Sequence, residues 1–305
     1  MENLGQENVP PHEGEIGPKD IMEDGIWRPS LFEKYRDKFR FGGITNKHKE
    51  ELGIGLGPEL KLITRLDRLK KDSFSEEKVR LGRFLVTALK KIDSEANPRE
   101  IVKTQLCHSS NVVLVDDDFL KKSPQEKIDS TLNTDGLITK EKEVPLCVTG
   151  ADCSPVSIFD PENEAIGIFH SGWKGTVEGI SVNGIKMMKD SFGSNPKNLV
   201  VSIGPSIDGN NYEVDNKVLL EFKKAFSEDE ISKIFTPSNE EGKYLLDVVK
   251  AIKIQLINAG VLERSIQISD IKTTKDGEYF SSARQSEGVQ NVDCNLYIAT
   301  LTKTK

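Results

Sequence analysis

Cys153 and His170 lie seventeen residues apart, at the two ends of a segment that is expected to form a β-hairpin. Cys153 comes just before the first apolar run of this segment, and His170 comes just after the second. The runs, residues 155–159 and 164–169, flank residues 160–163, whose Asp-Pro opening is typical of a tight turn. With that turn, Cys153 lies directly opposite His170, and their Cβ atoms are about 4.5–5.5 Å apart on one face. A thiolate and an imidazole at this separation can share one zinc ion.

Other roles for this pair stay open. A cysteine beside an apolar strand is more often a small buried hydrophobic residue. Scarcity favours a metal role, because the chain has only four His and four Cys in 305 residues. The same pair also suits a Cys-His hydrolase, with Cys153 as nucleophile and His170 as base. Metal content separates the two functions, since a zinc-bound thiolate is a poor free nucleophile.

Further motifs surround this pair in a fixed order. They are Thr-Asp-Gly-Leu-Ile-Thr at residues 134–139, Thr-Gly-Ala-Asp-Cys-Ser-Pro-Val at 149–156, His-Ser-Gly-Trp-Lys-Gly-Thr at 170–176 and Ile-Gly-Pro-Ser-Ile at 203–207. Arg-Phe-Gly-Gly-Ile-Thr at 40–45 and Cys-His-Ser at 107–109 precede them. Each motif alone is weak, but the ordered set, spread over residues 35–302, resembles the YfiH-type laccase-domain family.

The resemblance implies a zinc enzyme that acts on purine nucleosides. The family's metal ligands fall on His108, Cys153 and His170. Members phosphorolyse adenosine, inosine and methylthioadenosine to free base and ribose 1-phosphate, and also deaminate adenosine, so transferase and hydrolase chemistry are both expected. A non-catalytic binding protein that retains the metal scaffold is the remaining alternative.

The histidine count bears on the older description of the family as polyphenol oxidases. A His₂Cys set is also the core of a blue-copper site, but oxygen-reducing multicopper enzymes need a further histidine-rich cluster. Only His12 and His48 remain for such a cluster, and His12 lies in a polar leader. Three protein ligands and an open fourth position instead describe catalytic Zn²⁺, which can activate a bound water.

Phosphorolysis also needs an anion site. Residues 172–176 form a glycine-flanked turn that feeds a helix, so Lys174 and Thr176 are candidates to bind phosphate there. Lys174 stands where the family usually has arginine, and it supplies a point charge without a bidentate fork. A solvated surface lysine is the plain alternative.

A second set of anion-binding candidates lies elsewhere in the chain. Arg40 precedes Gly42 and Gly43, whose missing side chains would let a ligand approach the backbone. A structural salt bridge explains Arg40 equally well. Arg284 remains in a late motif in which Ala283 replaces another arginine. These departures make altered specificity or weakened activity an open possibility.

Two carboxylates adjoin the metal motifs. Asp135 lies in a Thr-Asp-Gly turn, and Asp152 directly precedes Cys153. Either could orient a zinc-bound imidazole or act as a general acid/base, and turn-stabilising bonds explain both. We favour the turn role for Asp135 and leave Asp152, a candidate catalytic residue, open.

Composition narrows the class of protein. Hydrophobic residues make up 36% and charged residues 30%, as in globular proteins, and the net charge of −7 argues against a nucleic-acid binder. No apolar run is long enough to span a membrane, and the first residues lack the plan of a signal peptide. Cys107, Cys147 and Cys294 are expected to be buried thiols, which fits a reducing, cytoplasmic location. The expected partners are a purine nucleoside and phosphate; the sequence does not indicate the oligomeric state.

The pattern of elements predicts an α+β fold. Residues 1–25 are expected to form a flexible leader, and residues 26–305 a single catalytic domain. The resemblance implies mixed β-sheets packed together with flanking helices. Helices are predicted at residues 77–92, 176–190 and 244–258, the last closed by Gly260 in a left-handed conformation. Strands are predicted at residues 112–115, 145–148, 155–159, 165–169, 199–203, 266–268 and 296–301.

Overall fold

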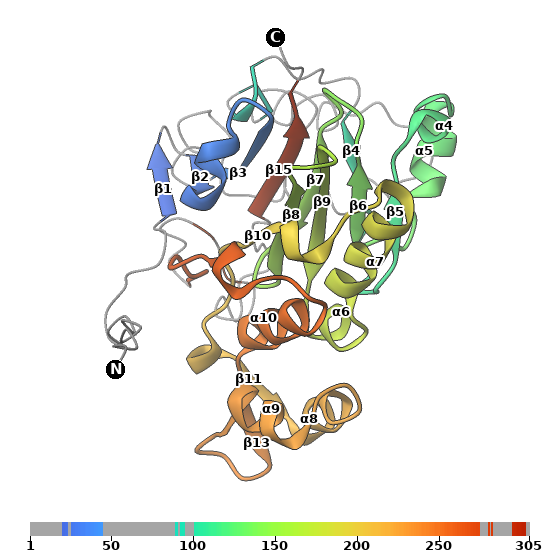
Figure 1. Cartoon of the computed structure of the whole chain (residues 1–305). Coiled ribbons are helices and arrows are strands. Elements are labelled where there is room, and N and C mark those ends of the chain that lie inside the picture. The colour runs from blue at the N-terminus through green and yellow to red at the C-terminus, as the bar shows by residue number, and fades with distance from the viewer. Residues whose placement is uncertain are drawn as a thin grey trace, which may run out of the picture.

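The computed structural model describes residues 20–23, 26–44, 89–90, 92–94, 101–274, 280, 282 and 295–302. Within this part of the chain, two six-stranded sheets and a three-stranded sheet are flanked by helices (Figure 1). This is the α+β fold with mixed sheets that the sequence predicts. The helix predicted at residues 77–92 lies mostly outside the described residues; Leu89, Lys90 and Ile92 are described and are helical.

The first sheet joins segments from both ends of the chain. Its strands, in spatial order, are β1 (Asp20–Glu23), β2 (Ile26–Pro29), β3 (Phe39–Ile44), β15 (Asn295–Leu301), β7 (Leu146–Gly150) and β4 (Val102–Lys103). Only the β4–β7 pair is parallel. β1 falls within the range expected to be a leader, and the predicted strands at residues 145–148 and 296–301 correspond to β7 and β15.

The second sheet contains the predicted hairpin at its centre. Its strands, in spatial order, are β14 (Ile266–Ile268), β10 (Val200–Ile203), β8 (Ser154–Asp160), β9 (Ala165–Ser171), β6 (Gly136–Thr139) and β5 (Val112–Leu114). Five of them match predicted strands, with ends that differ by at most two residues. β6 adds a sixth strand beside β9.

The register of the hairpin differs from the prediction by two residues. Asp160 pairs with Ala165, and Pro155, not Cys153, lies opposite His170. The four-residue loop lies one residue later than predicted, at residues 161–164. The Asp160 carboxylate closes it by accepting hydrogen bonds from the backbone N–H groups of Glu162 and Asn163, at 2.9 and 3.1 Å. A shift of two residues keeps every side chain on its face, so Cys153 and His170 still point the same way.

Helices and a small third sheet complete the fold. The α-helices are α4 (Asp117–Leu120), α5 (Pro124–Ser130), α6 (Trp173–Val177), α7 (Ile180–Phe192), α8 (Asn216–Phe222), α9 (Glu228–Ile234) and α10 (Val248–Asn258). The 3₁₀-helices are η1 (Ser30–Tyr35), η4 (Pro196–Asn198), η5 (Gly209–Asn211) and η6 (Glu263–Ser265), and the third sheet has the order β11 (Glu213–Asp215), β13 (Lys243–Leu246) and β12 (Phe235–Pro237).

Two predicted helices need correction. The helix predicted at residues 176–190 is two helices, because Gly179 adopts a left-handed φ of 77° between α6 and α7. The helix predicted at residues 244–258 begins only at Val248, after Asp247, whose side chain caps it by accepting from Lys250 N. The residues before Asp247 form β13. Gly260 has a φ of 96°, as predicted for the residue that closes α10.

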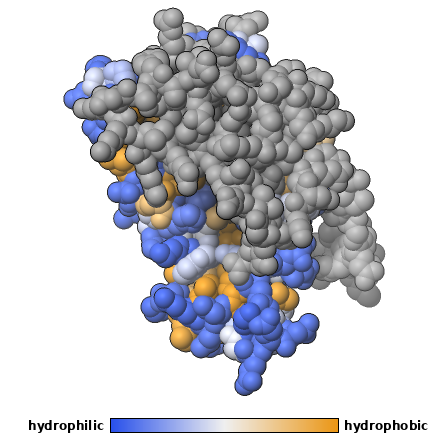
Figure 2. Space-filling model, turned by 180° about the vertical axis from the view of Figure 1, so that it is seen from behind, coloured by the Kyte–Doolittle hydropathy of each residue, from blue (hydrophilic) through white to orange (hydrophobic). Residues whose placement is uncertain are grey.

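The layers of the molecule share two hydrophobic cores. One core lies between the two large sheets, and the other lies between the second sheet and the helices α7 to α10. Seen from behind, hydrophilic side chains surround a smaller hydrophobic area at the lower end of the molecule, where Figure 1 places α8 and α9 (Figure 2). Among the described residues, no helix is both long enough and apolar enough to cross a membrane.

Candidate metal centre

Three potential metal ligands meet where the two large sheets approach each other. His108 comes from the loop between β4 and β5, Cys153 from the residues just before β8, and His170 from β9. One ligand atom from each lies within 4.8 Å of the others. The ligands of a tetrahedral zinc ion are about 3.3–3.8 Å apart, given bonds of about 2.0–2.3 Å, so a small contraction would close the group on a metal. His170 is buried, Cys153 is half-buried and His108 is exposed, which leaves one side open.

Glycines allow the start of α6 to lie against these ligands. A methyl group on Gly172 would lie 2.7 Å from Cys153 Sγ and 3.1 Å from His108 Cδ2. A methyl group on Gly175 would lie 2.9 Å from the Ser109 carbonyl oxygen. The distances of 2.7 and 2.9 Å are shorter than a Cβ atom tolerates, so only glycine fits at these two positions beside the metal ligands.

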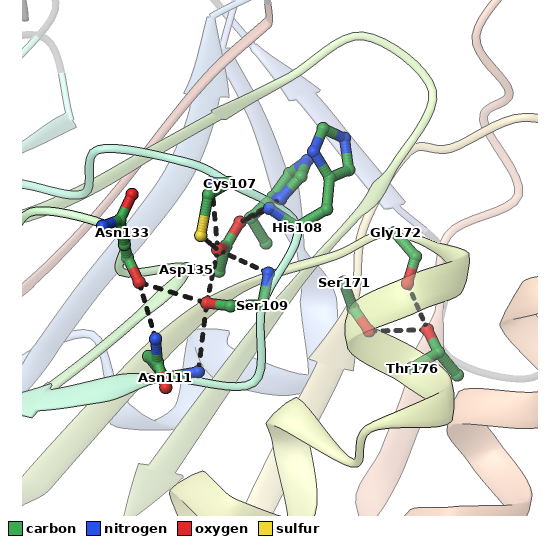
Figure 3. A network of polar contacts seen from close by, with 10 residues as sticks. Cys107, His108, Ser109, Asn111, Asn133, Asp135, Ser171, Gly172 and Thr176 are labelled. Atoms are coloured by element: carbon green, nitrogen blue, oxygen red, sulfur yellow. Dashed lines mark hydrogen bonds and ion pairs between the residues drawn. The ribbon is translucent and has the colours of Figure 1, made fainter.

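Asp135 contacts the loop that carries His108 (Figure 3) and also the imidazole of His170. Its carboxylate is fully buried, and Oδ1 lies 2.9 Å from His170 Nδ1. Backbone N–H groups of Cys107, His108 and Ser109 also donate to this carboxylate. The structure therefore corrects our preference for a simple turn role, since Asp135 is bound to the imidazole of a candidate ligand. With Nδ1 donating to Asp135, His170 presents Nε2 to the site.

The charges in this group stabilise one another. Burial would raise the pKa of Cys153, but the His170 charge and hydrogen bonds from His108 and His170 outweigh it and lower the pKa to about 6. Burial would likewise lower the pKa of His170, but the Cys153 thiolate and Asp135 raise it to about 10. For Asp135, burial opposes ionisation, yet hydrogen bonds from His170 and Ser109 hold its pKa well below its usual range. The centre thus favours a thiolate and an ionised carboxylate at neutral pH.

Asp152 links the residues next to Cys153 to other parts of the chain. Its Oδ1 accepts a hydrogen bond of 2.8 Å from Thr273 Oγ1, and its carbonyl oxygen accepts one from Ile207 N. Asn295 Nδ2 donates to the neighbouring Ala151 carbonyl oxygen at 3.3 Å. Segments from three other parts of the chain therefore hold the residues that carry Cys153.

The residues proposed to bind phosphate at α6 differ in their environment. Lys174 is exposed in the first turn of α6, close to the metal ligands in the chain. Thr176 is fully buried, and its hydroxyl donates to the Gly172 carbonyl oxygen at 2.8 Å and contacts Ser171 Oγ at 2.9 Å (Figure 3). The Thr176 hydroxyl is thus occupied by hydrogen bonds within the protein, and these contacts do not support an anion-binding role.

The structure does not bring Arg40 to the metal ligands. Arg40 pairs with Thr300 on β15, whereas Asn295, five residues earlier, pairs with Gly150 beside the site, about 17 Å away along the strand. The structure also gives other roles to the neighbouring glycines, since a methyl group on Gly42 would lie 2.9 Å from the Trp27 carbonyl oxygen and one on Gly43 would lie 2.7 Å from the Tyr297 ring. Their missing side chains allow strands and rings to pack closely. Arg284 lies outside the described residues.

The other cysteines are not alike. Cys147 is buried, and burial raises its pKa to about 12, as expected for an inert thiol. Cys107 is exposed, contrary to the prediction, and its Sγ lies 3.4 Å from Asp135 Oδ2. Cys294 lies outside the described residues. Trp173 is partly buried and packs against the hydrophobic core that includes residues of α7 and α10.

Solved structures share this fold. The structure of the Bacillus licheniformis hypothetical protein YfiH superposes with a TM-score of 0.73 at 22% identity, covering 92% of this chain and 97% of that one. YlmD from Geobacillus stearothermophilus superposes with a TM-score of 0.72 at 21% identity, covering 93% and 100%. At this level of identity the likeness extends to the fold alone.

Sequence relatives agree with the fold. A Bacteroides thetaiotaomicron protein named purine nucleoside phosphorylase is 32% identical over 62% of this chain and 69% of its own length. Purine nucleoside phosphorylase YlmD of Bacillus subtilis is 32% identical over 51% and 55%, and the Rickettsia conorii protein of that name, RC0672, is 30% identical over 68% and 79%. Residues 76–291 match the model of the family described as multi-copper polyphenol oxidoreductase laccase. The chain belongs to this laccase-like family, to which its motifs pointed.

Proposed function

We propose that this protein is a zinc-dependent purine nucleoside phosphorylase. The observation that carries the proposal is the group of His108, Cys153 and His170, with Asp135 bound to one imidazole, in a chain whose relatives are named purine nucleoside phosphorylases. The substrates would be phosphate and a nucleoside such as adenosine, inosine or methylthioadenosine. The products would be the free base and ribose 1-phosphate.

The donor set favours zinc over copper. Two imidazoles and one thiolate leave one tetrahedral position for a substrate, as in catalytic zinc sites. Oxygen reduction by copper would need a histidine-rich cluster, and the chain has four histidines, of which two are at this site. When bound, zinc supplies a Lewis acid that stabilises negative charge on the reacting groups.

The chain's own residues would supply the remaining functions. Asp152 lies next to a ligand and is the candidate for proton transfer. Lys174 lies exposed in the first turn of α6, where backbone N–H groups have no partner within the helix, and is the candidate for binding phosphate. Adenosine deamination is proposed as a second activity, because it needs the same ion, proton transfer and purine pocket.

The arrangement of Asp135, His170 and Cys153 is also consistent with a second candidate function. A carboxylate bound to an imidazole beside a thiol whose pKa is lowered to about 6 is the arrangement of a Cys-His hydrolase. Metal dependence distinguishes this function from the first.

Elemental analysis combined with a base-release assay tests the proposed function. We expect one zinc per chain, and phosphate-dependent release of adenine or hypoxanthine that a chelator abolishes. Cys153→Ala should lose the zinc, whereas the control Cys147→Ala, at a buried thiol outside the ligand group, should keep it. Stoichiometric copper, or full zinc in Cys153→Ala, would contradict the assignment. Base release that needs no phosphate and survives chelation would favour the hydrolase.

Substitution of Lys174 tests the phosphate site. Lys174→Ala should raise the KM for phosphate about tenfold with little effect on the KM for the nucleoside, because a charge-assisted contact to phosphate is lost. Lys189→Ala, at an exposed lysine on α7, is the matched control for the loss of one positive charge. An unchanged KM for phosphate in active Lys174→Ala enzyme would place the phosphate elsewhere.

A further inference from the structure

One carboxylate oxygen connects the two histidine ligands. Asp135 Oδ1 accepts from the backbone N–H of His108 at 3.0 Å and lies 2.9 Å from the Nδ1 of His170. The carbonyl oxygen of Asp135 also accepts from the backbone N–H of His170, at 2.8 Å. The position of each histidine relative to the other is therefore set through a single residue.

The second carboxylate oxygen binds the residues on either side of His108. Asp135 Oδ2 accepts from Cys107 N at 3.1 Å, from Ser109 N at 2.8 Å and from Ser109 Oγ at 2.8 Å. Three successive backbone N–H groups thus converge on one buried anion, as in the concave anion sites formed by turns. Here the anion is part of the protein.

This convergence explains the backbone of His108. His108 has a φ of 63°, in the left-handed region that residues other than glycine seldom occupy. Such a conformation persists only where the surroundings fix it, and the carboxylate of Asp135 supplies bonds to His108 and to both of its neighbours. Without that carboxylate, the loop would be free to relax, and the His108 imidazole would leave the site.

We infer that Asp135 is the positioning residue that holds both histidine ligands in place before a metal binds, with the Ser109 hydroxyl as its support. The inference deepens the proposed function and rests on its metal site. It does not depend on which reaction the enzyme catalyses, because it concerns the geometry of the ligands in the metal-free protein.

Asp135→Asn tests the inference, because the amide keeps the size of the side chain but presents an NH₂ group to N–H donors. In the metal-free variant, we expect the amides of residues 107–109 to exchange with solvent at least about tenfold faster, measured by NMR, and His170 to lose its fixed Nδ1–H tautomer. Zinc affinity, measured by competition with a chelator, should fall about 10–100-fold. Asp160→Asn is the matched control, since Asp160 is also a fully buried carboxylate that accepts backbone N–H bonds, at the far end of the same hairpin.

The outcomes separate positioning from general stability. Unchanged amide exchange and zinc affinity in Asp135→Asn would overturn the inference, as would an equal loss of affinity in Asp160→Asn. If Asp135→Asn does not fold, Ser109→Ala decides, because it removes one hydroxyl donor and leaves the backbone donors in place. Ser109→Ala should weaken zinc several-fold, and wild-type affinity would overturn the inference. Zinc binding can be measured whether or not phosphorolysis is observed, so failure of the proposed reaction remains distinguishable.

Discussion

At the scale of single residues, two thiols near the metal centre differ in the charges that surround them. Cys153 faces His108 and His170, and these imidazoles lower its pKa to about 6 against the effect of burial. Cys107 lies on the side of Asp135, and burial together with that negative charge raises its pKa. The thiolate form, which binds metals and attacks electrophiles, is therefore favoured at Cys153 alone of the two.

We expect the alkylation of these thiols to depend on pH in different ways. In metal-free protein, the rate at Cys153 should rise as the pH passes through about 6, while the rate at Cys107 should rise only above the usual thiol range. Peptide mass spectrometry after brief pulses of iodoacetamide measures both sites in one sample. Zinc should protect Cys153 and leave Cys107 reactive. A Cys153 rate that rises only near pH 9 would show that the imidazoles do not stabilise its thiolate.

The sequence motifs predicted which candidate ligands come together at the metal centre, but they did not predict which residue holds those ligands in place. His108, Cys153 and His170 meet as expected. The predicted hairpin brought Cys153 and His170 together, and the family resemblance added His108. The role of Asp135 was misjudged, because an aspartate in a turn has the same local pattern whether it caps the turn or binds a distant imidazole. The distinction arises from the pairing of β6 with β9, which no local pattern reveals.

At the scale of elements, the Phe169 ring occupies space left by glycines on its own strand and on two neighbouring elements. Methyl groups on Gly136 of β6, Gly167 of β9 and Gly184 of α7 would lie 2.6, 2.6 and 2.3 Å from atoms of this ring. Phe169 directly precedes His170 on β9. The close packing of α7 on the sheet therefore also fixes the strand that carries a candidate ligand.

Gly184→Ala should destabilise the protein, although alanine normally favours a helix. The gain in helix propensity is about 1 kcal/mol at most, whereas overpacking against the buried ring costs about 1–3 kcal/mol. We expect a net loss of stability in chemical denaturation and partial recovery in the double variant with Phe169→Leu. Ser191→Ala, at an exposed position of α7, controls for propensity and should not destabilise. A Gly184→Ala protein as stable as the wild type would mean that α7 can shift away from the sheet.

The elements that the sequence placed wrongly share a physical cause. An aspartate such as Asp160 can begin a turn or end a strand. The hydrogen bonds from its side chain to the loop place it at the end of the strand, and the sequence pattern alone does not reveal these bonds. The apolar residues of β13 continue the helical spacing of α10, so only the capping residue Asp247 marks the boundary. Local patterns identified the strongest elements and left these boundaries open.

At the scale of the whole molecule, a strand from the end of the chain completes the first sheet. β15 pairs with β3 along six residues and with β7 along five, and every residue of β15 is buried. The sequence predicted this strand but not its neighbours, because both pairings join segments more than 140 residues apart. Asn295, the first residue of β15, also binds the Ala151 carbonyl oxygen beside Cys153.

A chain that ends before Asn295 should therefore lose both its fold and its metal. Without β15, β3 and β7 have no common partner, and the apolar face of the first sheet loses the buried Tyr297, Ala299 and Leu301. We expect no cooperative thermal transition by circular dichroism, and no stoichiometric zinc. A chain that ends at residue 302 retains the whole strand and should match the full-length protein in both measurements. If the shorter chain unfolded cooperatively and bound zinc with full affinity, β15 would be an accessory to the sheet, and the Cys153 loop would hold its position without Asn295.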